Sequence, residues 1–207
     1  MLTTVDGVST PFDHIGSRYD DTRQDRSAQR AADAWLADRL PPGARVLDVG
    51  CGSGEPTAWE LSERGFEVVG VDESEVMLEL ARQTAPRATF HRRDLRELGA
   101  DLGEFEAVTA FFALLMLSRA EIPAVLADLR ARLRGPKLLV LGMVLGEFDA
   151  EPIDFLGTPL RVSAYPTEQL LAVVESAGFT VLEHRDVPLA APEGGRAEVH
   201  QFVHATA

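Results

Sequence analysis

The hydrophobic residues of this chain follow two spacings, one typical of amphipathic helices and one typical of buried strands. Apolar residues that recur every three or four positions predict helices. Short runs of β-branched and other apolar residues predict strands that are covered on both faces. Three of the predicted helices cover residues 22–40, 122–133 and 167–177. Two more are predicted between them: one of roughly ten residues after Gly54, and one that begins at Ser74. The predicted strands cover residues 45–49, 67–72, 88–93, 105–112, 137–141, 179–182 and 199–203.

This alternation of strands and helices is the pattern of a parallel sheet with helices on both faces. No helix separates the last two strands, so we expect the final strand to run antiparallel. The sequence therefore predicts an α/β protein with a Rossmann-like, doubly wound and mainly parallel seven-stranded sheet whose last strand is antiparallel. Ligands bind beyond the carboxyl ends of such strands, so the informative loops follow Val49, Asp72, Arg93 and Phe112.

A glycine-rich loop follows the first predicted strand, with Gly50, Gly52 and Gly54 at alternate positions. Glycine tolerates a positive φ and lets a ligand approach the backbone, and the free N–H groups of a helix start attract negative charge. A dinucleotide fingerprint would place its third glycine three residues after the second, where this chain has Glu55. No Gly-Lys-Ser/Thr element occurs. The loop therefore indicates neither a dinucleotide nor a nucleoside triphosphate.

Carboxylates follow the next two predicted strands. Asp72 ends the second strand and Glu73 comes next, about 20 residues after the glycines, where nucleotide-binding sheets place a ribose-binding acid. Asp94 follows the third strand at the matching edge of the sheet. Two such acids, with no basic residue for a phosphate, fit an uncharged nucleoside that carries a small zwitterion.

At these positions the sequence resembles the class I S-adenosylmethionine-dependent methyltransferases. Residues 46–54 match the first motif of that family, Val71-Asp72 with Met77-Leu78 is similar to its second, and Arg93-Asp94-Leu95 is similar to its third. The resemblance implies S-adenosyl-L-methionine as cofactor, with its methionyl part at the glycines, its ribose at Asp72 and its adenine at Asp94 and Leu95. The pair Tyr19-Asp20 resembles one in small-molecule members whose Tyr covers the cofactor. The predicted cofactor-binding residues are Tyr19, Asp48, Gly50, Gly52, Gly54, Asp72, Glu73, Met77, Asp94, Leu95 and Phe111.

Each polar residue of this set also has a simpler structural interpretation. Asp48 orders the glycine loop if it accepts hydrogen bonds from backbone N–H groups. The structural alternative for Asp72 is a charge at a helix N-terminus, and for Asp94 it is a turn former. For Tyr19 it is packing on the N-terminal helix. The joint occurrence of the motifs favours cofactor binding.

Methyl transfer from a sulfonium is an in-line displacement, so the protein mainly aligns the acceptor atom, the methyl carbon and the leaving sulfur. A general base is needed only where the acceptor loses a proton. His14 precedes Tyr19 in a segment that we expect to fold over the site, and these two are the candidate catalytic residues. The remaining histidines are interpreted as packed or solvated, with the last three away from the acceptor: His91, His184, His200 and His204.

The acceptor pocket is expected to form from the first 20 residues, the loop 111–117 and residues 145–166. Its aromatic and methionine residues are also typical of a core, but their grouping favours a hydrophobic small molecule. The candidate substrate-binding residues are Phe12, Phe112, Met116, Phe155 and Tyr165. The ends of the fourth and fifth strands are apolar where a catechol-type enzyme carries its metal ligands, so no metal is predicted.

Composition narrows the partners and the compartment. The 207 residues include 20 Lys and Arg against 33 Asp and Glu, and the formal charge of −13 argues against nucleic acid. The chain has no signal-like start and no apolar run of about 20 residues, so we expect a cytoplasmic protein without membrane contact. We expect a monomer or homodimer, with residues 1–40 as an N-terminal helical lid and 41–207 as the methyltransferase domain, including a cap insertion at 145–166.

The leading hypothesis is a methyltransferase that moves a methyl group to O, N or C of a hydrophobic small molecule by direct displacement. One alternative is a cyclase or other non-methylating enzyme that uses the same cofactor on the same scaffold. A second alternative is a non-catalytic nucleoside-binding module. Product mass distinguishes the methyltransferase from the cyclase. Consumption of the cofactor distinguishes both enzymes from the binding module.

Overall fold

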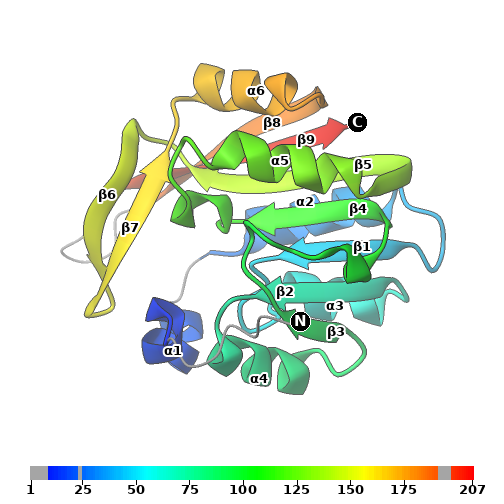
Figure 1. The fold of residues 1–207 in the computed structure, drawn as a ribbon, viewed down its shortest axis with the longest axis horizontal. Helices are drawn as coiled ribbons and strands as arrows, with labels where there is room; N and C mark the ends of the chain where they lie inside the picture. The colour runs from blue at the N-terminus through cyan, green and yellow to red at the C-terminus, as the bar shows by residue number, and fades with distance from the viewer. Residues whose placement is uncertain (1–8, 23–24, 191–196) are drawn as a thin grey trace.

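The computed structural model describes residues 9–22, 25–190 and 197–207. Its centre is a seven-stranded sheet in the order β3-β2-β1-β4-β5-β9-β8. The strands are β1 (Arg45–Val49), β2 (Glu67–Asp72), β3 (Thr89–Arg92), β4 (Phe105–Phe111), β5 (Leu133–Val144), β8 (Thr180–Leu189) and β9 (Glu198–Thr206). The first five strands pair in parallel, whereas β9 inserts antiparallel between β5 and β8. The predicted fold class is therefore confirmed (Figure 1).

Helices cover both faces of this sheet, as its nearly continuous apolar strands require. On one face lie α2 (Ser27–Ala37), α3 (Thr57–Glu63) and α4 (Glu75–Thr84), and on the other lie α5 (Ile122–Ala131) and α6 (Thr167–Ser176). The helical periodicity explains this packing. In α5, Ile122, Val125, Leu126 and Leu129 form one stripe, and all four are buried against the sheet.

The helix α2 is shorter than predicted, and its buried stripe differs from the apolar pattern. It spans Ser27–Ala37 instead of 22–40, and Ala31 on the expected stripe is exposed. Asp33 is completely buried instead, because its carboxylate accepts a hydrogen bond of 3.0 Å from the hydroxyl of Thr57 on α3. Hydrophobic periodicity cannot reveal such a partner.

Residues 145–166, expected as a cap, contain a β-hairpin separate from the main sheet. Its strands are β6 (Phe148–Phe155) and β7 (Thr158–Ala164). In Figure 1 the hairpin stands at the carboxyl edge of the main sheet, on the same side as α1 (Pro11–Ile15) and the 3-10 turn η1 (Gly16–Thr22). The sequence pattern missed these strands because acidic residues and a proline interrupt the alternation along β6.

The hairpin and the N-terminal segment hold each other in place. Leu160 and Val162 of β7 form a small apolar cluster with Ile15 of α1. Arg18 of η1 donates a hydrogen bond of 3.0 Å to the carbonyl oxygen of Leu156 in the hairpin turn. Two segments far apart in sequence thus meet at one edge of the sheet.

The topology fixes where a ligand can bind. The chain passes from β1 to β2 and β3, then returns to β4 on the other side of β1, so the strand order reverses between β1 and β4. The loops on either side of that reversal diverge and leave a crevice at the carboxyl ends of the strands. Two 3-10 turns, η2 (Ala100–Leu102) and η3 (Leu114–Met116), lie before and after β4.

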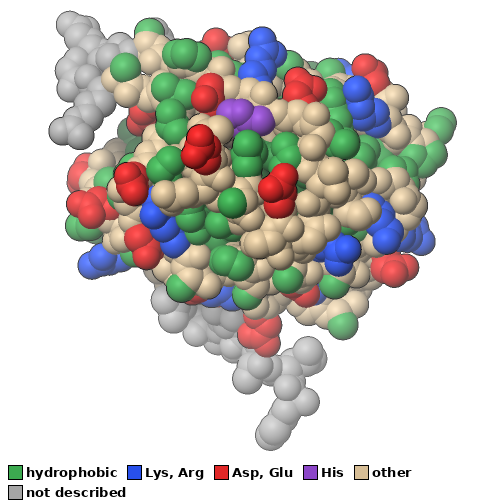
Figure 2. Space-filling view, turned by 90° about the horizontal axis from the view of Figure 1, so that it is seen from above, with side chains coloured by type: hydrophobic (Ala, Val, Ile, Leu, Met, Phe, Trp, Pro, Cys, Tyr) green, Lys and Arg blue, Asp and Glu red, His purple; other side chains and the backbone are tan. Residues whose placement is uncertain are grey.

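The outer surface carries mixed charge. Figure 2 views the molecule from the side of α6 and β8, and acidic and basic side chains are interspersed over that face. Among the described residues, no helix combines the length and apolar character needed to cross a membrane.

The core of α5 gives a direct test of this packing. Leu129→Ala should lower the free energy of unfolding by about 2–5 kcal/mol, because it leaves a cavity in a side-chain position that is fully buried. Leu182→Ala on the edge strand β8, where the side chain is 52% exposed, should change it by no more than about 0.5 kcal/mol. Urea denaturation of both variants measures the difference, and equal losses would contradict the assigned core.

Candidate functional site

A cavity of about 170 Å³ opens at the carboxyl ends of β1 to β4, where the strand order reverses. The four loops that the sequence singled out all contribute to its wall. Ten of the eleven predicted cofactor-binding residues line it: Tyr19, Asp48, Gly50, Gly52, Asp72, Glu73, Met77, Asp94, Leu95 and Phe111. The structure thus brings together residues that are spread over more than 90 positions of the chain.

The three glycines have different tasks. All three have positive φ, at 65°, 53° and 85° for Gly50, Gly52 and Gly54. A Cβ on Gly50 would lie 2.4 Å from that of Ala113, and one on Gly54 would lie 3.3 Å from the Cα of Ala81 on α4. Gly54 therefore serves helix packing and does not face the cavity. A Cβ on Gly52 would meet nothing within 4 Å, so the open backbone beside the cavity leaves room for a ligand there.

Asp72 joins the glycine loop to the start of α4. Its Oδ2 accepts a hydrogen bond of 3.0 Å from the backbone N–H of Gly52, and its Oδ1 accepts one of 2.9 Å from the N–H of Ser74. Burial raises the pKa of Asp72 in spite of these two donors. The carboxylate is therefore both a charge at a helix N-terminus and a group on the cavity wall.

Asp48 does not have the structural role that the sequence left open for it. It accepts a hydrogen bond of 2.7 Å from the hydroxyl of Thr109 on β4, and within the described residues it accepts none from a backbone N–H group of the glycine loop. Asp72 orders that loop instead. Burial raises the pKa of Asp48 to about 7, although the Thr109 hydroxyl opposes the shift.

Basic side chains also line the cavity, which corrects the expectation that none is available. Arg26, Arg93 and Arg96 all contribute to the wall. Each is held by a carboxylate: Asp20 for Arg26, Asp101 for Arg93 and Asp94 for Arg96, at 2.8, 2.7 and 2.7 Å. No sequence pattern predicts these contacts, because a charged side chain in a loop is usually solvated.

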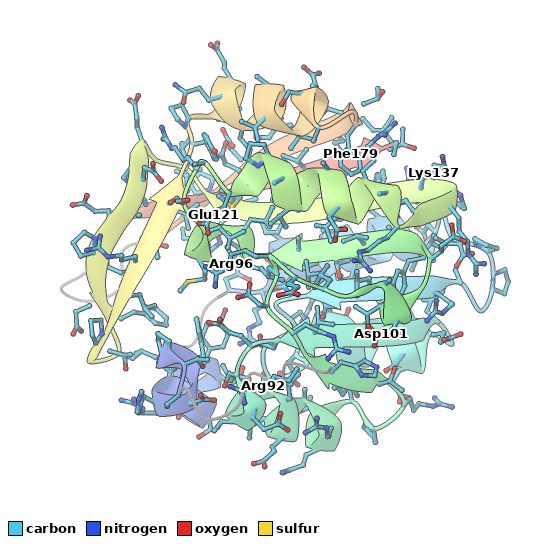
Figure 3. All side chains as sticks on the ribbon, viewed as in Figure 1. Arg92, Arg96, Asp101, Glu121, Lys137 and Phe179 are labelled. Carbon is cyan, nitrogen blue, oxygen red and sulfur yellow. The ribbon has the colours of Figure 1, made fainter. Side chains whose placement is uncertain are left out.

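Arg96 closes one end of the cavity. It forms a fork with Asp94 and reaches Glu121 at the start of α5 at 3.4 Å. Figure 3 labels Arg96 and Glu121 side by side between the end of β3 and the start of α5. Hydrogen bonds from Arg96 lower the pKa of Asp94, so Asp94 is an ionised acceptor on this wall.

Only part of the predicted lid lies over the cavity. Phe12 and Tyr19 come from α1 and η1 and line it, whereas α2 packs on a face of the sheet and adds only Gln29 to the wall. Asp20 accepts a hydrogen bond of 3.0 Å from the Ser53 hydroxyl in the glycine loop. Asp13 accepts one of 2.6 Å from the Ser74 hydroxyl. Residues 1–8 and 23–24 of the predicted lid lie outside the described residues.

Only some of the predicted catalytic and acceptor-binding residues line the cavity. Tyr19, Phe12, Phe112 and Met116 line the cavity. His14 does not, because its side chain is exposed on the outer side of α1, where its ring lies 3.3 Å from the Ser9 hydroxyl.

Phe155 and Tyr165 also lie outside the cavity wall. The Phe155 ring packs 6.3 Å from the Tyr19 ring, which places it behind the lining residues. Tyr165 is buried, and its hydroxyl donates to the carbonyl oxygen of Arg119 at 3.1 Å. Phe155 therefore packs on a residue of the wall, whereas Tyr165 belongs to the apolar core on the α5 face of the sheet.

One residue that the sequence placed away from the acceptor lies close to the site. Because β9 runs antiparallel, its first residues reach the edge where the parallel strands end, and His200 pairs with Val144 there. The His200 ring lies 4.5 Å from the ring of Phe112, a lining residue with a left-handed backbone (φ 56°). Glu198 approaches His200 at 3.5 Å. His200 is thus buried and packed, as the sequence indicated, but it packs against a residue of the cavity wall.

Comparison with known proteins agrees with this geometry. Residues 46–135 match the family model described as methyltransferase domain. An uncharacterized methyltransferase of Synechocystis is 32% identical over 155 residues, which cover 69% of this chain and 70% of that protein. The CcbJ methyltransferase of Streptomyces caelestis superposes with a TM-score of 0.75 at 18% identity, over 96% of this chain and 98% of that one, and shares the fold. The chain belongs to the class I S-adenosylmethionine-dependent methyltransferases.

Two further relatives match over shorter stretches. Magnesium-protoporphyrin O-methyltransferase of Rhodobacter capsulatus is 32% identical over 133 residues, or 60% of this chain and 57% of that enzyme. A putative methyltransferase of Bacillus subtilis is 42% identical over 77 residues, or 36% of this chain and 31% of that protein. The match thus spans 57% and 31% of the length of these two relatives.

The buried carboxyl of Asp48 predicts how stability depends on pH. Because burial raises its pKa from 3.8 to about 7, the folded chain binds more protons than the unfolded chain between about pH 4 and about pH 7. The free energy of unfolding should therefore fall as pH rises through this window, by up to about 1.4 kcal/mol per pH unit from this group. Asp48→Asn should have a shallower slope in urea denaturation, and the exposed Asp38→Asn should keep it. Equal slopes in the native protein and Asp48→Asn would contradict the shift.

Proposed function

We propose that the protein binds S-adenosyl-L-methionine and transfers its methyl group to O, N or C of a hydrophobic small molecule by direct displacement. The observation that carries this proposal is the position of Asp72. Its buried carboxylate ends β2, lines the cavity and lies beside the open backbone of Gly52. This is where a parallel sheet holds the ribose of a nucleoside.

The residues of the wall fit the parts of the cofactor. Gly52 offers open backbone for the methionyl part, and Asp72 offers carboxylate oxygens for the ribose hydroxyls. Met77 and Leu95 supply apolar surface at the end where ionised Asp94 can accept from an exocyclic amine. The cofactor would supply a methyl group on a sulfonium.

The apolar residues of the wall support an apolar acceptor. The cavity is lined by Phe12, Phe111, Phe112 and Met116. The Rhodobacter relative is named for action on magnesium protoporphyrin, a small molecule, which agrees with this chemistry. Alignment of acceptor and methyl group in such a water-poor space lowers the barrier by roughly 7–11 kcal/mol.

Tyr19 is best assigned to closing the site, and not to taking a proton. Burial raises the pKa of its hydroxyl, so the hydroxyl stays protonated at neutral pH and cannot act as a base there. His14 lies outside the cavity wall. The proposed chemistry therefore rests on positioning, with Tyr19 and Phe12 excluding water.

A methyl-transfer screen tests the reaction. The full chain is incubated with S-adenosylmethionine labelled in the methyl group and a metabolite library rich in apolar compounds, and products are analysed by mass. Products heavier by one methyl group support the proposal. Products of unchanged mass would favour the cyclase alternative, and bound but unconsumed cofactor with every compound would favour the binding module.

The ribose assignment predicts a loss of binding on substitution of Asp72. Asp72→Ala should weaken binding of S-adenosylhomocysteine by at least tenfold in calorimetry, because hydrogen bonds to a charged group contribute about 1.5–3 kcal/mol. Thermal denaturation of Asp72→Ala detects a folding defect, because this variant also loses the acceptors of the Gly52 and Ser74 N–H groups. Asp38→Asn on the surface should bind normally. Unchanged affinity in a folded Asp72→Ala variant would contradict the assignment.

We also propose that the segment 9–22 is the lid and that Asp20 holds it closed through the Ser53 hydroxyl and Arg26. Asp20→Ala should open it more often and speed tryptic cleavage after Arg18 several-fold, because a lost hydrogen bond of about 1 kcal/mol raises the open population about fivefold. S-adenosylhomocysteine should slow this cleavage in the native protein. Ser53→Ala should resemble Asp20→Ala, and Asp38→Asn should behave as native. Cleavage that is indifferent to both substitutions and to the ligand would contradict the lid.

A further inference from the structure

Three buried aspartates lie along the side of the cavity that carries the glycine loop. Asp33 on α2, Asp48 on β1 and Asp72 on β2 are 0%, 3% and 9% exposed. Within the described residues, none of them forms an ion pair with Lys or Arg, and their hydrogen-bond partners are hydroxyl and backbone N–H groups. A buried carboxylate without a cation is costly in its charged form.

The three acids differ in how well their charge is supported. Asp72 has a backbone N–H donor for each oxygen, so it is the best placed to be ionised. Asp48 has one donor, the hydroxyl of Thr109. Asp33 has one donor, the hydroxyl of Thr57, and its Oδ1 has no hydrogen-bond partner. Asp48 is the member of this less supported pair that lines the cavity.

The charged and titratable groups around Asp48 and Asp33 do not stabilise a negative charge on either carboxyl. Asp72 from β2 opposes a charge on Asp48, and a charge on Asp48 opposes one on Asp33. The Cys51 thiol of the glycine loop is held neutral by the same two acids on β1 and β2 and by its own burial. The cations that act on Asp33 are Arg30 and Arg64, and Arg30 is paired with Glu60. In the part of the chain that the structure describes, no cation is therefore committed to Asp48.

We propose that the cofactor enters this site in exchange for a proton, which Asp48 gives up to solvent as the ammonium group of the methionyl part arrives. This inference rests on the proposed function and adds how that site responds to pH. The O–H bond of the Asp48 carboxyl breaks, its electron pair stays on the carboxylate, and the proton goes to the buffer. The ammonium ion supplies the positive charge that the protein does not provide.

The titration of Asp48 supports the exchange. Burial raises its pKa to about 7, so near pH 6 most of the ligand-free protein carries this proton. A cation beside the carboxylate lowers the pKa and releases the proton. Burial and the charge on Asp48 both raise the pKa of Asp33 and oppose its ionisation in the complex as well.

Calorimetry in pairs of buffers with different heats of ionisation tests the exchange. S-adenosylhomocysteine should release most of one proton per molecule bound at about pH 6 and little at about pH 8, and its affinity should rise about tenfold between them. The matched probe is 5′-methylthioadenosine, which lacks the ammonium group. It should bind with a heat that is independent of the buffer.

Substitutions assign the proton to a residue. Asp48→Asn should bind S-adenosylhomocysteine without proton release and with an affinity that no longer changes with pH, whereas surface Asp38→Asn should behave as native. Asp33→Asn should keep the release, because an amide resembles the protonated acid. Loss of release in Asp33→Asn would overturn the assignment to Asp48.

The outcomes also separate the two proposals. Binding of S-adenosylhomocysteine with a buffer-independent heat in the native protein, or equal proton release with 5′-methylthioadenosine, would overturn the exchange and leave the proposed function standing. No binding of S-adenosylhomocysteine at either pH would overturn the proposed function itself.

Discussion

The hydrogen bonds of Asp72 are the contacts on which the site depends. One carboxylate oxygen accepts from Gly52 and the other from Ser74, so a single side chain joins the glycine loop to the first turn of α4. Ser74 also donates to Asp13 of the N-terminal segment. The loop, the helix start and the segment over the cavity are therefore linked through two neighbouring polar residues at the end of β2.

Over the described ranges of the chain, that arrangement buries carboxylates in the cavity wall without a cation beside them. The arginines that line the cavity are each held by a carboxylate, whereas the acids of β1 and β2 have only hydroxyl or N–H partners among the described residues. A site of this kind favours a ligand that brings positive charge and no phosphate. The net charge of −13 also favours a cationic ligand, but only the few buried acids of the site act on the ligand directly.

Aromatic packing across the sheet holds another residue of the cavity wall. Phe112 leaves β4 with a left-handed backbone, and its ring contacts His200 and Phe202 of β9. A bulky residue keeps such a conformation only where its surroundings enforce it. The antiparallel strand β9 thus shapes this part of the cavity wall, although it is the last strand of the chain and carries none of the family motifs.

The sequence by itself determined the sheet, its helices and the loops that form the cavity, because strand and helix periodicities and the glycine spacing are local properties. Ten predicted cofactor residues line the cavity for that reason. Only the tertiary structure decided that Gly54 packs on α4, that Asp33 is buried against Thr57, that His14 points outward and that His200 reaches Phe112. Each of these depends on a partner distant in sequence, and the charge state of a buried acid depends on all of its neighbours at once.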